Sequence, residues 1–288
     1  KLFIIHSEIL KFFLKHFNFP KLSMNSSHLS LLQLTDLHIL PAPEITLLGI
    51  NTEYYFNRVL NHAFTQSVSY DAILISGDLA QSPSKATYQR ILHKIEEYHL
   101  PTMCLPGNHD DFELMQEVLN TSLVSCRKHV ILGNWQLLIL NSQILKSEGG
   151  YLEQTELDFL ESCLEKNSHL FTLIAMHHNC LPSDSKWLDT MQIKNSDELL
   201  ALVARYPKVK VITTGHIHQE MDKKLGDVAV FGTPSTCFQF AKNSADFAMD
   251  RTPPGYRIIE LHDNGEVTSQ VHRIDTVLSE LEITSEGY

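Results

Sequence analysis

The sequence predicts a single α/β domain in which two packed β-sheets are covered by helices on the outside. In the first half of the chain, short apolar runs alternate with segments of helical periodicity, which is typical of crossover units and a mainly parallel sheet. The C-terminal part turns to β-strands, with a hairpin-type turn at residues 263–265. No repeat, low-complexity tract or Pro/Gly/Ser-rich linker divides the 288 residues, so we expect one large domain.

The first half opens with a strand predicted from Leu29 to Thr35, where apolar residues dominate. Pro41 and Pro43 then favour a loop. The further elements predicted in this half are, in chain order, a helix over residues 51–69, a strand over 72–75, a helix over 84–98 and a strand over 102–106.

The second half continues with buried strands separated by amphipathic helices. Asn195 and Glu198 have the spacing of a capping box and predict the start of a helix that runs to about Arg205. The elements predicted here are a strand over 135–140, a helix over 155–164, a strand over 171–176, the helix over 195–205, and strands over 209–212, 227–231, 256–261 and 266–274.

Composition argues for the cytoplasm and against nucleic acid. The formal net charge of −11, from 23 basic and 34 acidic residues, disfavours a phosphate backbone as partner, since such contacts need clustered Lys and Arg. The five cysteines are scattered without a CxxC pair, which suits free thiols in a reducing compartment. No apolar run is long enough to cross a bilayer, so we expect no membrane association.

The first 23 residues are expected to lie outside the functional domain. They are apolar but repeatedly interrupted by charged residues and His, and they lack the features of a signal peptide. Met24 stands directly before the first predicted strand and reads like a natural start, so we expect an N-terminal extension over 1–23 and a catalytic domain over 24–288. An amphipathic surface helix is the alternative for residues 1–23.

Five polar blocks follow apolar runs, each at a point where a strand ends and a loop begins. Taken singly, each block has an ordinary explanation as a turn, a helix cap or a core histidine. Because ligands bind at the carboxyl ends of strands in open α/β sheets, the five blocks can converge on one site. The blocks are Asp36-Leu37-His38, Gly77-Asp78, Gly107-Asn108-His109-Asp110, His177-His178 and Gly215-His216-Ile217-His218.

The side chains in these blocks suit metal ions. Carboxylates, an amide oxygen and several imidazoles are good ligands for divalent ions, and no thiolate is required. A structural zinc ion would use four ligands, often Cys. The seven candidates exceed what one ion needs and predict two ions that share a ligand: Asp36, His38, Asp78, Asn108, His177, His216 and His218.

The five blocks resemble the motifs of the calcineurin-like metallophosphoesterases, from about Leu29 to the C-terminus. Further stretches resemble the bacterial class III 3′,5′-cyclic-AMP phosphodiesterases (CpdA type) within that superfamily. The fold that this resemblance implies is a four-layer αββα sandwich of two mixed sheets flanked by helices. The stretches outside the metal motifs are Leu31–Asp36, Leu48–Thr52, Gly232–Phe240 and Pro254–Arg257.

The resemblance also implies how the ligands are shared between the ions. Asp78 bridges the two ions, and His178 is the alternative to His177. Iron and manganese are the metals we expect, although zinc accepts the same ligands. The first ion is held by Asp36, His38, Asp78 and His218, and the second by Asp78, Asn108, His177 and His216.

The expected reaction is hydrolysis of 3′,5′-cyclic AMP to 5′-AMP, by attack of a hydroxide that bridges the two metal ions. After the carboxylates and the hydroxide are counted, two divalent ions leave a charge of about +1, which neutralises one phosphodiester. His109 is expected to protonate the leaving oxygen, with Asp110 as its partner. Phosphate contacts are expected from His38, Asn108, His109 and His218.

Other functions remain open at this stage. The same metals serve phosphomonoesterases and nucleotide pyrophosphatases, and some members of the superfamily are metal-dependent scaffolds. A scaffold has no use for a proton donor such as His109, which favours an enzyme. Phe238-Gln239-Phe240 either holds a nucleobase or packs in the core. The sequence does not decide whether cyclic AMP or cyclic GMP is the preferred substrate, or whether the protein is a monomer or a homodimer.

Overall fold

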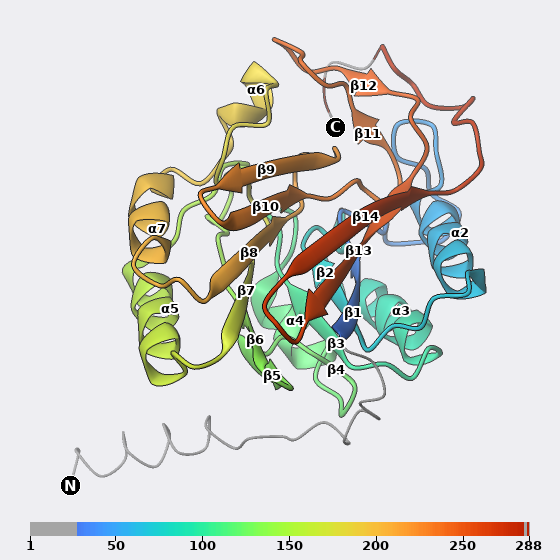
Figure 1. Cartoon of the computed structure of the whole chain (residues 1–288). Coiled ribbons are helices and arrows are strands. Elements are labelled where there is room, and N and C mark those ends of the chain that lie inside the picture. The colour runs from blue at the N-terminus through green and yellow to red at the C-terminus, as the bar shows by residue number, and fades with distance from the viewer. Residues whose placement is uncertain (1–27, 285–286, 288) are drawn as a thin grey trace, which may run out of the picture.

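Two six-stranded sheets form the centre of the computed structural model, which describes residues 28–284 and 287. The expected N-terminal extension lies outside these residues. The first sheet has the order β14-β13-β1-β2-β3-β4 (Figure 1). Its strands are β1 (His28–Leu34), β2 (Ala72–Ser76), β3 (Thr102–Leu105), β4 (Val124–Ser125), β13 (Gly255–His262) and β14 (Val267–Arg273).

The second sheet has the order β5-β6-β7-β8-β10-β9. Both sheets are mixed, because β13, β14, β5 and β9 each run antiparallel to a neighbour. The strands of the second sheet are β5 (His129–Leu132), β6 (Trp135–Ile139), β7 (Phe171–Ala175), β8 (Val209–Thr214), β9 (Met221–Leu225) and β10 (Val228–Gly232). A separate ribbon pairs β11 (Gln239–Phe240) with β12 (Met249–Asp250).

Helices cover the outer faces of the two sheets. In Figure 1, α2 and α3 lie beside the first sheet, and α5 and α7 lie beside the second. The prediction of two mixed sheets flanked by helices is therefore confirmed. The helices are α2 (Thr52–Thr65), α3 (Lys85–Glu96), α4 (Phe112–Val118), α5 (Gln154–Lys166), α6 (Lys186–Asp189) and α7 (Ser196–Val203).

Burial on both faces explains why the central strands are continuous apolar runs. Leu31 and Leu74 belong to the core between the sheets, which also contains Leu137 and Leu173 from the second sheet. The alternate residue Leu32 packs in the core on the helix side. Parallel strands covered on both faces need apolar residues at every position, so the sequence shows no alternation there.

The capping box predicted at the start of α7 is wrong. Asn195 precedes the helix, but its side chain makes no capping hydrogen bond. Its Oδ1 accepts from Leu152 N at 3.0 Å and its Nδ2 donates to Leu152 O at 2.9 Å. The Asn195 side chain therefore forms tertiary hydrogen bonds with Leu152 and does not cap the helix. Among the described residues, no helix combines the length and apolar character needed to cross a bilayer.

Arg257 links the two sheets. It lies on β13, its side chain is buried, and it donates hydrogen bonds to Gly232 O at 2.9 Å and to Asp222 Oδ1 at 2.8 Å, both in the second sheet. Its guanidinium also lies 4.6 Å from the centre of the Phe231 ring. The cation thus satisfies polar groups between layers that are otherwise apolar.

Arg257→Ala is expected to lower the free energy of unfolding by about 3 kcal/mol or more, because it leaves a buried carbonyl without a donor and opens a void. Urea unfolding measures the loss. Arg205→Ala is the matched control, since Arg205 is half exposed in its ion pair with Glu161; it should cost less than about 1 kcal/mol. Equal losses in the two variants would contradict the role of Arg257.

Candidate metal centre

The five polar blocks lie together at the carboxyl ends of strands from both sheets. Asp36 and His38 follow β1, Asp78 follows β2, and the turn Gly107–Asp110 follows β3. The other two blocks follow β7 and β8. Ligand atoms within 4.8 Å of one another form four groups: Asp36, His38 and His218; His38, Asp78 and His109; Asp36, Asp78 and His177; and His177, His178 and His216.

Asn108 completes the seven candidates, because its Oδ1 lies 3.2 Å from His177 Nε2. The fold therefore brings together all seven residues that the sequence suggested as ligands. Six of them are buried, and Asn108 is partly exposed. A group of polar side chains this deeply buried needs partners that satisfy it.

The backbone is left-handed at five of the candidate ligands. Non-glycine residues pay about 1–2 kcal/mol for this conformation. Hydrogen bonds between the motif loops hold the first two: Asp36 N donates to Gly77 O at 3.0 Å and His38 N donates to Asp78 O at 2.9 Å. The positive φ values are 52° at Asp36, 48° at His38, 51° at Asp78, 66° at His216 and 46° at His218.

Glycine precedes Asp78 and Asn108 because neighbouring side chains come very close to the backbone there. A Cβ on Gly77 would lie 2.2 Å from His177 Nδ1, and Gly77 itself has φ +98°. A Cβ on Gly107 would lie 2.1 Å from Asp78 Oδ1. Both distances are far inside van der Waals contact, so the Gly-Asp and Gly-Asn-His motifs have a steric cause.

Hydrogen bonds at Nδ1 set the tautomers of three imidazoles. His38 Nδ1 lies 2.6 Å from Gln81 Oε1, His177 Nδ1 2.8 Å from Ser76 O, and His218 Nδ1 2.9 Å from Phe238 O. Carbonyl oxygens only accept, so in each neutral ring Nδ1 carries the hydrogen and Nε2 carries a lone pair. This is how metal-binding histidines are commonly oriented.

The Nε2 atoms point into the cluster. His218 Nε2 lies 3.3 Å from Asp36 Oδ1, and His177 Nε2 lies 3.3 Å from Asp78 Oδ2. His38 Nε2 and His218 Nε2 are only 3.1 Å apart. One cation bound to both Nε2 atoms would satisfy this close pair.

The charges of the cluster also suit cations. Burial lowers the pKa of His38 to about 3 and holds that of His216 well below its usual value. Burial opposes ionisation of Asp78, but the adjacent His177 holds the pKa of that carboxyl well below its usual range. In turn, although burial opposes it, Asp78 raises the pKa of His177 to about 9, so a metal ion bound to His177 would replace a proton there.

His216 and His178 differ in how they are held. Among the described residues, no group forms a hydrogen bond with the buried His216 Nε2, so this nitrogen is suited to a metal ion. His178 Nε2 donates to Glu148 O at 3.2 Å, and its Nδ1 lies 2.8 Å from Ser142 Oγ. The partners of His178 are not candidate ligands, whereas His177 Nε2 faces Asp78 Oδ2 and Asn108 Oδ1, so the geometry favours His177 as the ligand. The donor set therefore fits a pair of metal ions.

Asp110, expected as the partner of His109, binds groups of several loops. Its buried carboxylate accepts hydrogen bonds from Leu79 N, Ala80 N, Gly107 N and Tyr88 OH, at 2.9–3.1 Å. Burial raises its pKa to about 6, with a contribution from Asp78. Asp110 therefore joins the loop after β2 to the loop after β3, and short-range sequence reasoning missed this because the partners are about 30 residues away.

His109 lies at the partly exposed side of the cluster. Its backbone N donates to Asp78 Oδ1 at 2.9 Å. Its ring packs edge-on against His38, with centroids 5.1 Å apart. The position is that of a group beside the candidate metals and accessible to a ligand.

Phe238 and Phe240 belong to the core of this region, so the alternative of core packing is the correct one. Phe238 is fully buried and Phe240 is 3% exposed. Phe240 stacks on His218 with centroids 4.4 Å apart, and Phe238 stacks on His38 at 5.7 Å. The two phenyl rings thus restrict the orientation of the His38 and His218 imidazoles.

Comparison with known proteins agrees with this geometry. A family profile described as calcineurin-like phosphoesterase matches residues 29–220. The chain is 38% identical over 261 residues to the 3′,5′-cyclic adenosine monophosphate phosphodiesterase CpdA of Haemophilus influenzae, covering 90% of this chain and 95% of the relative. It is 37% identical over 259 residues to CpdA of Escherichia coli K12, covering 90% and 94%.

Among solved structures, a dimetal phosphatase from Danio rerio matches with a TM-score of 0.53 at 12% identity, covering 85% of this chain and 98% of that one. At this identity the match speaks for the fold alone. With the family profile spanning most of the chain and relatives that match along nearly their whole length, this chain belongs to the calcineurin-like phosphoesterase family.

Proposed function

We propose that this protein is a metal-dependent 3′,5′-cyclic-nucleotide phosphodiesterase that hydrolyses cyclic AMP to 5′-AMP. The observation that carries the chemistry is the buried cluster of two carboxylates, four imidazoles and the Asn108 amide. The names of relatives that match over nearly their whole length support the choice of substrate. One further relative, from Nostoc, is named more broadly as a 3′,5′-cyclic-nucleotide phosphodiesterase.

The residues would divide as follows. His38, Asp36 and His218 hold the first metal ion, Asn108, His177 and His216 the second, and Asp78 lies between the two. Iron or manganese suits these oxygen and nitrogen ligands, and zinc also accepts them. Two such ions, when bound, supply an activated hydroxide and positive charge for the phosphate. The proposed location is the cytoplasm.

The chain's own groups carry the rest of the reaction. Hydrolysis adds hydroxide to phosphorus, breaks the bond from phosphorus to the 3′-oxygen, and leaves a proton to be supplied to that oxygen. His109 stands beside the cluster and gives that proton. Asn108, His38 and His218 are the further residues proposed to contact the phosphate, together with His109.

Asp78→Ala should remove the shared ligand and lower activity on cyclic AMP by more than about 10²-fold, since even an outer partner of a metal ligand is worth 10–100-fold. Elemental analysis of the purified variant should find less than the full metal content. His218→Ala should keep more metal than Asp78→Ala. Asp158→Ala, an exposed carboxylate on α5, is the control and should behave as wild type. Full activity and metal content in Asp78→Ala would end the two-metal proposal.

His109→Ala should lower activity by different factors on two substrates that differ in their leaving group. The 3′-oxygen of ribose leaves as a poor alkoxide and needs a proton, a contribution of about 10²–10⁴-fold. A p-nitrophenolate is stable near neutral pH and needs none. The variant should therefore lose far more activity on cyclic AMP than on bis-p-nitrophenyl phosphate, with metal content unchanged. His93→Ala, on the exposed side of α3, is the control.

Equal losses on both substrates would mean that His109 positions the phosphate instead of protonating the product. Loss of metal would make His109 a ligand or a structural support of the site. The alternative of a phosphomonoesterase or nucleotide pyrophosphatase predicts faster cleavage of p-nitrophenyl phosphate, or of a nucleotide pyrophosphate, than of cyclic AMP. Product analysis on these substrates separates the two functions.

A further inference from the structure

The turn Gly107–Asp110 carries Asn108 and His109, and its backbone alone closes it weakly. The backbone hydrogen bond from Asp110 N to Gly107 O is 3.3 Å long, beyond the usual N–H···O range. Side chains therefore complete the turn. Within it, Gly107 N donates to the Asp110 carboxylate at 3.0 Å, and from the first sheet Asp78 Oδ1 accepts from His109 N at 2.9 Å.

Gln143 supplies the contacts from the other side. Its Nε2 donates to Gly107 O at 2.8 Å and to Asp110 O at 2.6 Å. A side-chain amide nitrogen has two hydrogens, and both are used here. A single planar group thus ties the first and last residues of the turn to each other.

The base of Gln143 is itself fixed. Gln143 N donates to Asn141 Oδ1 at 2.9 Å, and Asn141 N donates to Glu156 Oε2 at 3.0 Å. The other oxygen of Glu156 accepts from Lys128 Nζ at 2.6 Å. The chain of hydrogen bonds runs from α5 to the loop after β6, so the amide of Gln143 is held by the second sheet.

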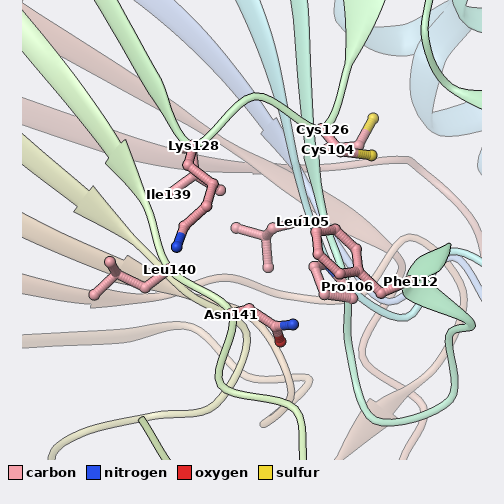
Figure 2. Close-up of a pocket in the computed structure, with 9 residues that line it drawn as sticks. All are labelled: Cys104, Leu105, Pro106, Phe112, Cys126, Lys128, Ile139, Leu140 and Asn141. Carbon is pink, nitrogen blue, oxygen red and sulfur yellow. The ribbon is translucent and has the colours of Figure 1, made fainter. Parts of the chain in front are cut away.

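The two segments that Gln143 joins do not fill the space between them. Figure 2 shows Leu140 and Asn141 on one side of a small cavity and Leu105 and Pro106 on the other. The cavity has a volume of about 10 Å³, room for one water molecule at most.

We propose that Gln143 is a positioning residue for the proton donor. It holds the turn so that His109 stays in register with the metal ligands, and it links the loop after β6 in one sheet to the loop after β3 in the other. This inference rests on the proposed function, because it assigns Gln143 an effect through His109 in that reaction.

The test uses Gln143→Ala and Gln143→Glu in the metal-loaded enzyme. A misplacement of about 1 Å costs on the order of 10²-fold, so kcat on cyclic AMP should fall by about 10- to 100-fold with KM little changed. The rate on bis-p-nitrophenyl phosphate should fall by less than about threefold. Metal content should stay as in wild type, and the variants should remain folded at the assay temperature. Gln154→Ala, an exposed glutamine on α5, is the control.

Gln143→Glu keeps the shape of the side chain, but an ionised carboxylate has no hydrogen to donate. It should be as slow as Gln143→Ala. Wild-type rates in Gln143→Glu would show that packing suffices and would overturn the proposal. Loss of metal in either variant would also overturn it, since Gln143 would then support the metal ligands.

A double variant decides whether Gln143 acts through His109. If it does, His109→Ala with Gln143→Ala should be no slower on cyclic AMP than His109→Ala alone. Multiplied losses would overturn the proposal. If His109→Ala is selective for cyclic AMP and Gln143→Ala is not, this inference fails and the proposed function stands. If His109→Ala is itself unselective, the assignment of the proton donor fails and this inference fails with it.

Discussion

The structure depends on one constraint: two buried carboxylates, Asp36 and Asp78, share a small volume with several imidazoles at the edge where the two sheets meet. Taking carboxylates out of water costs several kcal/mol each unless opposite charge compensates. The imidazoles give only part of that compensation, since burial keeps those of His38 and His216 neutral. The cluster is therefore built for cations, and the rest of the site follows from keeping these groups close.

Holding these groups so close costs free energy, which interactions in the surrounding fold must offset. Left-handed backbone at Asp36 and Asp78 is unfavourable, and glycine is needed at Gly77 and Gly107 because a Cβ would overlap a ligand. The parallel strands align the loops at one edge, and the Asp110 carboxylate joins two of them. The sheets thus work as a frame that holds strained loops in place.

The succession of most strands and helices along the chain could be predicted from the sequence, because apolar runs and helical spacing are local signals. The residues of the cluster could be predicted to lie together as well, since each follows such a run and belongs to a recognisable block. What could not be predicted acts over long sequence distances. Tyr88 and Gln143 reach the Gly107–Asp110 turn from 22 or more residues away, and no local pattern marks them.

At Asn195 a local pattern misled the prediction. The spacing is that of a helix cap, but the side chain forms its hydrogen bonds with the backbone of Leu152 instead. Short elements such as β4 and α6 were missed because two to four residues carry too little periodicity.

The central claim is that this cluster is a centre for two metal ions. Anomalous X-ray scattering from crystals of the full chain grown with manganese tests it most directly, because it locates the metal itself. The account predicts two peaks, one among Asp36, His38 and His218 and one among Asn108, His177 and His216, with Asp78 between them. A single peak, or peaks away from these side chains, would contradict it.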